Sequence, residues 1–180
     1  MSDDHPYLGT DLTPQAYYER EAARYDNPHA PGIHQLLEAT LAGVAGTVLD
    51  LGCGDGLVSK WLAGRAGVRC VGVDRAAAMV ARYEHETGWP GVVSTFDQPL
   101  PAADWIVSSY ALHLATPAEE AAMWWRMWET GARHVVVVTP LKARPAAPAH
   151  YFSLAQAISA GVGPGGKTIH ARRYTRSGPA

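Results

Sequence analysis

The feature that most constrains the fold is a glycine-rich segment directly after a short apolar run. Residues 47–51 form the run, and three glycines follow it at every second position: Gly52, Gly54 and Gly56. A short apolar, β-branched run is typical of a strand buried on both faces of a parallel sheet. Glycine permits turn conformations and a close ligand approach that a β-carbon obstructs. The sequence therefore predicts a strand-to-helix turn at the edge where open α/β sheets bind ligands.

Predicted strands and helices alternate along the rest of the chain. Further strands are predicted at residues 68–73, 91–95, 104–109, 134–139 and 168–175. Helices are predicted at residues 14–25, where Thr13 is the expected N-cap, and at 31–41, 57–63, 75–86, 117–130 and 151–159. Parallel strands need crossover connections, and right-handed crossovers place helices on both faces of the sheet. The predicted fold is therefore α/β, a doubly wound and mostly parallel sheet preceded by two N-terminal helices.

The 180 residues suit one domain, because a chain of this length buries roughly 70% of its unfolded surface around a single core. We expect residues 1–180 to form that domain, with an N-terminal helical lid at about 13–45 and a core at about 47–139. The C-terminal edge at about 147–176 is predicted to be abbreviated, because only one strand is expected there. A partner chain that completes the site is one interpretation.

Composition and charge narrow the function. The formal charge of −2 gives no overall attraction to nucleic acid or to an anionic membrane. The two cysteines, Cys53 and Cys70, have no spacing that suggests a disulfide or a zinc site, so no metal is expected. The first thirty residues contain no apolar stretch long enough for a signal peptide or a membrane span. These observations favour a cytoplasmic protein without membrane or nucleic-acid partners.

Two acidic residues sharpen the ligand class. Asp50 and Asp74 end the first and second predicted strands, and a carboxylate at Asp74 can accept hydrogen bonds from both hydroxyls of an unphosphorylated ribose. Adenosine-type ligands and NAD both remain open on that evidence. The dinucleotide fingerprint G-x-G-x-x-G would require glycine where Leu57 stands, so the spacing disfavours a nicotinamide-dependent oxidoreductase.

The sequence of residues 48–56, Val-Leu-Asp-Leu-Gly-Cys-Gly-Asp-Gly, closely resembles motif I of the class I S-adenosylmethionine-dependent methyltransferases. The resemblance extends over about residues 17–139. It includes residues 71–74, similar to the acidic motif of the second strand, and residues 105–114, similar to the segment after the fourth strand. It implies that S-adenosyl-L-methionine is the cofactor and that its methyl group moves to an acceptor by in-line displacement.

The resemblance also implies the cofactor residues. Those expected around the methionine portion are Asp50, Gly52, Cys53, Gly54 and Gly56. Those expected along the ribose, the adenosine and the floor of the site are Asp74, Arg75, Met79, Phe96, Asp97, Ser109 and Tyr110. Phe96 and Asp97 match the adenine-contacting pair by position, although their sequence departs from the usual small-acidic pattern.

The acceptor side is less defined by the sequence. His113 follows the fourth predicted strand where substrate enters in the resembling enzymes, and its ordinary pKa suits proton removal near neutrality. A purely structural histidine is the alternative. Tyr17, Tyr18 and Tyr25 are candidates for a lid, by similarity to small-molecule methyltransferases with an N-terminal helix. The prediction is accordingly a small-molecule acceptor.

Other functions use the same residues. A catalytically silent S-adenosylmethionine-binding partner or sensor would share every cofactor residue. Basic residues towards the C-terminus keep an RNA methyltransferase open: Lys142, Arg144, Lys167, Arg172, Arg173 and Arg176. Three tryptophans on one predicted helix, Trp124, Trp125 and Trp128, suit core packing, a substrate wall, or contact with a partner subunit or a second copy in a homodimer.

Overall fold

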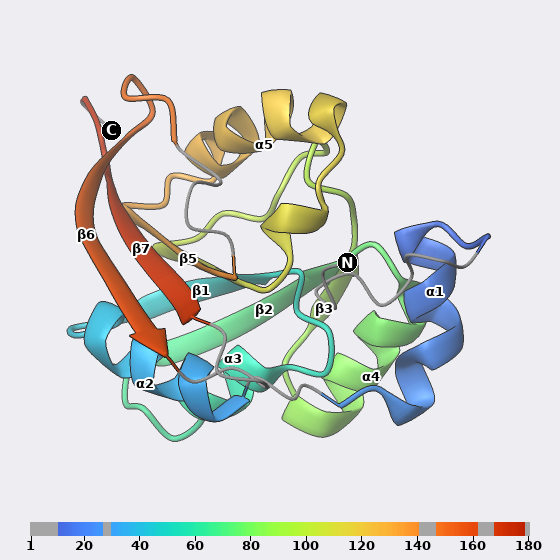
Figure 1. Ribbon diagram of the computed structural model, residues 1–180. Coiled ribbons are helices and arrows are strands. Elements are labelled where there is room, and N and C mark those ends of the chain that lie inside the picture. Colours follow the sequence, from blue (N-terminus) through green and yellow to red (C-terminus); the bar gives the residue numbers. More distant parts are fainter. Residues whose placement is uncertain (1–10, 27–29, 141–146, 162–167, 179–180) are drawn as a thin grey trace.

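The computed structural model describes residues 11–26, 30–140, 147–161 and 168–178, and its centre is one seven-stranded sheet (Figure 1). The strand order is β3-β2-β1-β4-β5-β7-β6. The strands are β1 (Gly46–Leu51), β2 (Val68–Asp74), β3 (Gly91–Val93), β4 (Trp105–Ser109), β5 (His134–Thr139), β6 (Phe152–Gly161) and β7 (Thr168–Arg176). β1 to β5 pair in parallel, and β7 lies antiparallel between β5 and β6. The mostly parallel α/β fold is confirmed.

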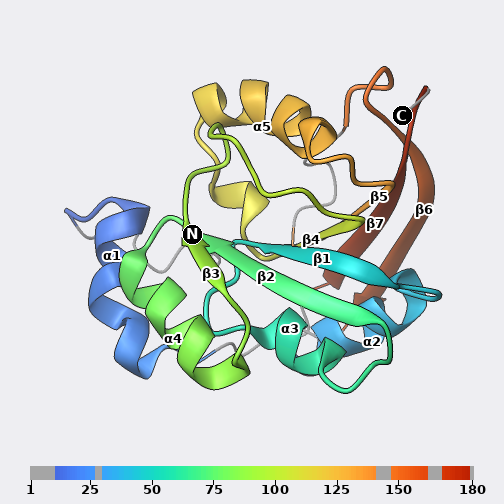
Figure 2. The ribbon, with the colours of Figure 1, turned by 180° about the vertical axis from the view of Figure 1, so that it is seen from behind.

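Helices cover both faces of the sheet. They are α1 (Pro14–Glu21), α2 (Ala30–Thr40), α3 (Leu57–Leu62), α4 (Ala77–Thr87) and α5 (Pro117–Glu129), with single 3-10 turns η1 (Ala22–Arg24) and η2 (Leu112–Leu114). Figures 1 and 2 show α5 on one face, α2, α3 and α4 on the other, and α1 beside α4. Thr13 caps α1 as predicted, because its hydroxyl oxygen accepts from the Ala16 N–H at 3.2 Å. In the part of the chain described, no helix is both long and apolar enough to cross a membrane.

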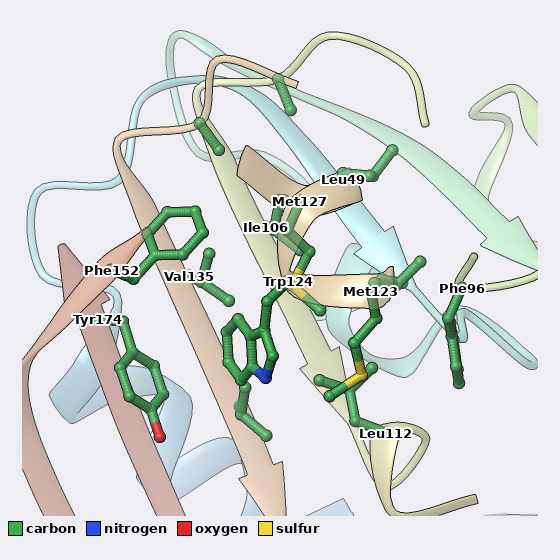
Figure 3. Packing of buried hydrophobic residues seen from close by; sticks show 14 of the residues in the cluster. Leu49, Phe96, Ile106, Leu112, Met123, Trp124, Met127, Val135, Phe152 and Tyr174 are labelled. Atoms are coloured by element: carbon green, nitrogen blue, oxygen red, sulfur yellow. The ribbon is translucent and has the colours of Figure 1, made fainter. Parts of the chain in front are cut away.

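The core is divided by the sheet into two clusters. Alternate residues of β1 point to opposite faces, so Leu49 belongs to the cluster under α5 and Val48 to the cluster over α2 and α3. Figure 3 shows Met123, Trp124 and Met127 of α5 packed over the buried residues of the central strands. Trp124 is thus a core residue, whereas Trp125 is 39% exposed and stacks on Trp128.

The C-terminal edge differs from the sequence prediction. Residues 151–159 were predicted to be helical, but Phe152–Gly161 is the strand β6, paired antiparallel with β7. The prediction was wrong because alanine, leucine and glutamine favour helices locally, while pairing with a distant strand decides the structure. A register shift between Leu154 and Gln156 also breaks the simple alternation of a strand.

The edge therefore holds two strands instead of one. The predicted abbreviation to one strand was therefore wrong, whereas a partner chain that completes the site stays a prediction. The connection to this edge is simple in the part that the structure describes, because residues 147–151 between β5 and β6 form no helix.

Candidate functional site

A pocket opens at the carboxyl ends of β1, β2 and β4, with about 710 Å³ of empty space including its open mouth. This is the edge that the glycine segment predicts. Predicted site residues that line it are Tyr18, Tyr25, Asp50, Gly52, Cys53, Gly54, Asp74, Arg75, Met79, Phe96, Ser109 and Tyr110. Four predicted residues are not among the lining residues: Tyr17, Gly56, Asp97 and His113.

Two glycines of the glycine segment, Gly52 and Gly54, line the pocket. Gly52 has φ +77°, and a β-carbon there would lie 2.1 Å from the Ala111 β-carbon. No larger residue fits without moving the segment after β4, so the glycine at position 52 lets the turn after β1 pack directly against Ala111. Gly56 differs, because a β-carbon there would meet Thr87 at 2.5 Å and Tyr83 at 3.1 Å. Its glycine lets α3 pack against α4.

Asp50 is buried at the end of β1, beneath the glycine segment. Its Oδ2 accepts from the Ser59 N–H at 3.2 Å and from the Ser59 hydroxyl at 2.8 Å. The Ser59 Oγ also lies 2.8 Å from the Tyr83 hydroxyl oxygen. Burial raises the pKa of Asp50 to about 7, and the neighbouring carboxylates Asp55 and Asp74 act in the same direction. The carboxyl group is thus poised to ionise when a cation arrives.

Asp74 joins the second strand to the glycine segment. Its Oδ2 accepts from the Gly54 N–H at 3.1 Å, and its Oδ1 from the Ala76 N–H at 3.0 Å. Burial raises its pKa, while these two hydrogen bonds act in the opposite direction. A carboxylate oxygen has two lone pairs, so each oxygen can accept a further hydrogen bond from a ligand hydroxyl.

Arg75 forms a wall of the pocket together with Phe96. Its guanidinium group lies 5.2 Å from the centre of the Phe96 ring and donates to the Glu119 Oε1 at 2.6 Å. Glu119 belongs to the capping box that begins α5. Asp97 accepts from the Thr95 hydroxyl at 2.6 Å, a bond that lowers the pKa of Asp97.

The segment after β4 forms the floor. The Ser109 hydroxyl oxygen is buried and has no hydrogen-bond partner among the described residues. Tyr110 has φ +55°, an uncommon conformation for a residue with a side chain, and one that tends to occur at functional sites. His113 lies in η2 with its ring edge-on to Tyr110, 5.9 Å between ring centres. The next residue, Leu114, lines the pocket.

Two of the three predicted lid tyrosines line the pocket. Tyr18 of α1 and Tyr25 after η1 pack edge to face, with ring centres 5.8 Å apart. Burial raises the pKa of the Tyr25 hydroxyl, which therefore stays protonated. The Tyr17 ring packs against the Tyr18 ring, with ring centres 5.2 Å apart, but Tyr17 does not line the pocket.

The sequence prediction missed six lining residues: Pro14, Asp55, Leu57, Val58, Ala111 and Leu114. A signal existed for Asp55, which lies within the glycine segment, and for Ala111 and Leu114, which lie in the segment after the fourth strand. Nothing in the local pattern of Pro14 indicates a site, because its position depends on how α1 packs.

Comparison with known proteins gives one consistent result. Residues 49–136 match the family model described as a methyltransferase domain. Two solved structures that resemble the chain each contain a bound S-adenosyl compound. N-methyltransferase NodS from Bradyrhizobium japonicum WM9, in complex with S-adenosyl-L-homocysteine, has a TM-score of 0.75 and 16% identity, covering 93% of this chain and 100% of its own. Magnesium protoporphyrin IX methyltransferase ChlM from Synechocystis PCC 6803, with bound SAM, has a TM-score of 0.70 and 17% identity, covering 98% and 99%.

A third similar structure is the complex between the Haloferax volcanii Trm112 methyltransferase activator and a putative methyltransferase. Its TM-score is 0.65 at 15% identity, covering 88% of this chain and 97% of its own. In sequence, no curated protein matches the chain.

Proposed function

We propose that the chain, whose residues 49–136 match a methyltransferase domain, is a class I S-adenosylmethionine-dependent methyltransferase that transfers the methyl group of S-adenosyl-L-methionine to a small-molecule acceptor. The observation that carries the proposal is the shape of the pocket. Tyr18 and Tyr25 of the N-terminal segment line it together with the glycine segment, so the N-terminal segment encloses part of the pocket. A partly enclosed pocket suits a small acceptor better than a macromolecule.

The residues fit the cofactor. Gly52 lines the pocket and leaves no side chain between its backbone and a ligand, and the buried Ser109 hydroxyl lacks a partner among the described residues. In the proposed site, Asp74 accepts from the ribose hydroxyls, Phe96 and Arg75 flank the adenine, and Asp50 lies near the methionine portion. Bound S-adenosyl-L-methionine supplies a methyl group attached to a positively charged sulfur. The acidic pocket favours that charge.

Similar structures support the acceptor class. NodS is an N-methyltransferase and ChlM acts on magnesium protoporphyrin IX, as their names state. Among the described residues that line the pocket, Arg75 is the only Lys or Arg side chain, and it pairs with Glu119. An acceptor of high negative charge therefore finds little to hold it there.

In-line methyl transfer requires alignment of acceptor and methyl group, and a base where the acceptor atom carries a proton. We assign the enclosing role to Tyr18 and Tyr25, with Tyr17 packed against Tyr18. We propose His113 as the base, and because His113 does not line the pocket, this role requires that its ring reach the acceptor when the site is occupied. Replacement of His113 by Gln should lower kcat by roughly 10²-fold or more, the usual contribution of a general base, without changing cofactor affinity.

The test is a screen for S-adenosylhomocysteine formation with small amines, phenols and carboxylates, and with RNA as a separate arm. Turnover with a small molecule supports the proposal. Turnover only with RNA would identify an RNA methyltransferase, and cofactor binding without turnover would favour a silent partner or sensor.

An Asp74→Ala variant is the cofactor control for that screen. We expect it to fold and to bind S-adenosylhomocysteine more weakly by roughly 1.5–3 kcal/mol, the range for hydrogen bonds to a charged group. Calorimetric titration measures the change. Unchanged affinity in a folded variant would contradict the ribose role of Asp74.

A further inference from the structure

Residues 14–25, which carry two of the tyrosines that line the pocket, are attached to the domain with little apolar burial. α1 has no buried residue, and the only buried apolar residue of the segment is Ala22. Ala22 packs in a small cluster with Ala76 and Met79, against which Tyr18 and Tyr25 lie. So little apolar burial leaves a large share of the attachment to polar contacts.

The first polar contact is made by Glu19 of α1. Its Oε1 accepts from the Ala77 N–H at 2.6 Å, and its Oε2 accepts from the Ala78 N–H at 2.9 Å. The first N–H groups of a helix need partners from outside the helix, and a negative charge is favourable there. α4 has no acidic residue in its first turn and no side-chain cap from Ala76. Glu19 therefore supplies from α1 the cap that α4 lacks.

The second polar contact is made by Arg82 of α4. Its Nη1 donates to the carbonyl oxygens of Ala22 at 2.7 Å and Tyr25 at 2.6 Å. The two contacts thus fasten both halves of the segment to the same helix, which Figures 1 and 2 show running beside α1. Both halves carry a tyrosine that lines the pocket.

The turn that Glu19 binds is also the turn that holds Asp74. The Ala76 N–H donates to Asp74, and the Ala77 and Ala78 N–H groups donate to Glu19. Two carboxylates therefore share three successive amides. If residues 14–25 move away and release Glu19, the Ala77 and Ala78 N–H groups lose their charged partner. These groups lie next to Asp74, the residue proposed to bind the ribose.

We propose that Glu19 is a positioning residue that retains the cofactor. Its carboxylate fastens residues 14–25 to the start of α4 and so keeps Tyr18 and Tyr25 over the bound cofactor. The inference rests on the cofactor site proposed above, but not on the identity of the acceptor. Exchange of S-adenosylhomocysteine for a new cofactor then requires release of Glu19 from the Ala77 and Ala78 amides.

The matched variants are Glu19→Gln and Glu21→Gln. Both remove one negative charge from α1, but among the described residues Glu21 pairs with Arg20 and Arg24, which lie on its own segment. Dissociation of radiolabelled S-adenosylhomocysteine is followed after a chase with unlabelled ligand. We expect Glu19→Gln to dissociate the ligand about tenfold faster or more, because hydrogen bonds to a charged group are lost. Glu21→Gln should stay within about twofold of wild type.

Hydrogen exchange separates a positioning role from general stabilisation. In Glu19→Gln the Ala77 and Ala78 amides should lose protection in the ligand-bound protein, while amides of the central strands keep theirs. Unchanged dissociation from a folded Glu19→Gln variant would overturn the inference, as would an equal acceleration in Glu21→Gln. In either case the proposed methyl transfer would stand. Absence of S-adenosylhomocysteine binding to wild type would overturn both.

Discussion

At the scale of single residues, the site is dominated by three carboxyl groups. Asp50, Asp55 and Asp74 all line the pocket, and each of the last two acts to raise the pKa of Asp50. Lys60 contacts Asp55 at 3.2 Å but also Glu86 at 2.7 Å, so it neutralises Asp55 only in part. A ligand with a positive charge relieves this mutual repulsion, which is why a sulfonium compound suits the site.

The pH dependence of cofactor binding follows from Asp50. The pKa of Asp50 is about 7 in the folded protein, against a usual value of 3.8. The protonated carboxyl group therefore contributes folding stability that is fully present below about pH 3.8 and is lost as the pH rises through 7. A cation in the pocket favours the ionised form, so binding below pH 7 should release a proton. Affinity for S-adenosyl-L-methionine should then rise with pH by up to about tenfold per unit, and level off above 7.

Calorimetric titration at pH 6, in two buffers of different ionisation enthalpy, counts the protons released. Asp50→Asn is the control, because it retains the shape of the side chain but cannot titrate. Its binding should show little pH dependence over the same range. Absence of proton release from the wild-type protein at pH 6 would contradict the assignment.

At the scale of elements, α5 is connected to the pocket through its first turn. The Thr116 hydroxyl accepts from the Glu119 N–H at 3.2 Å, and the Glu119 Oε2 accepts from the Thr116 N–H at 2.8 Å. The other oxygen of Glu119 binds Arg75. The same carboxylate therefore both begins a helix and holds a wall of the pocket.

Two substitutions separate these roles. Thr116→Ala removes only the cap and should lower the free energy of unfolding by about 1 kcal/mol. Glu119→Ala should cost about 3 kcal/mol, because it also leaves Arg75 without its partner where the two side chains are only 16% and 9% exposed. Urea denaturation measures both values, and an Arg75→Ala background isolates the ion pair. If Glu119→Ala lowers the free energy of unfolding no more than Thr116→Ala does, the expected contribution of the Arg75–Glu119 ion pair is contradicted.

The accuracy of the sequence prediction also varied by element. The run of residues 134–139 is rich in valine and its strand was predicted, because its burial on both faces is visible in its composition. β6 was missed, because its partner β7 and its bulge are not visible in a local pattern. Asp50 and Asp74 could be placed at the pocket because the ends of parallel strands meet at one edge. The Glu19 contacts join residues 58 and 59 positions apart, and no periodicity indicates them.

At the scale of the whole molecule, the pocket lies where separately packed parts meet. The cluster under α5 contributes Phe96 and Ala111, the cluster over α2 and α3 includes Val58, and the small cluster of the N-terminal segment contributes Met79. All of these residues line the pocket. A ligand there contacts all three clusters at once, so its binding should resist unfolding of the domain as a unit.

S-adenosylhomocysteine should therefore raise the melting temperature. At a ligand concentration of 100 times Kd, mass action adds about 2.7 kcal/mol, which corresponds to about 5–11 °C for a domain of this length. NADH at the same concentration should give no shift, because Leu57 occupies the position of the third glycine of the dinucleotide fingerprint. Differential scanning calorimetry measures both. An equal shift with NADH would mean that the pocket recognises adenosine and its ribose alone, and that the spacing of the glycine segment does not exclude a dinucleotide.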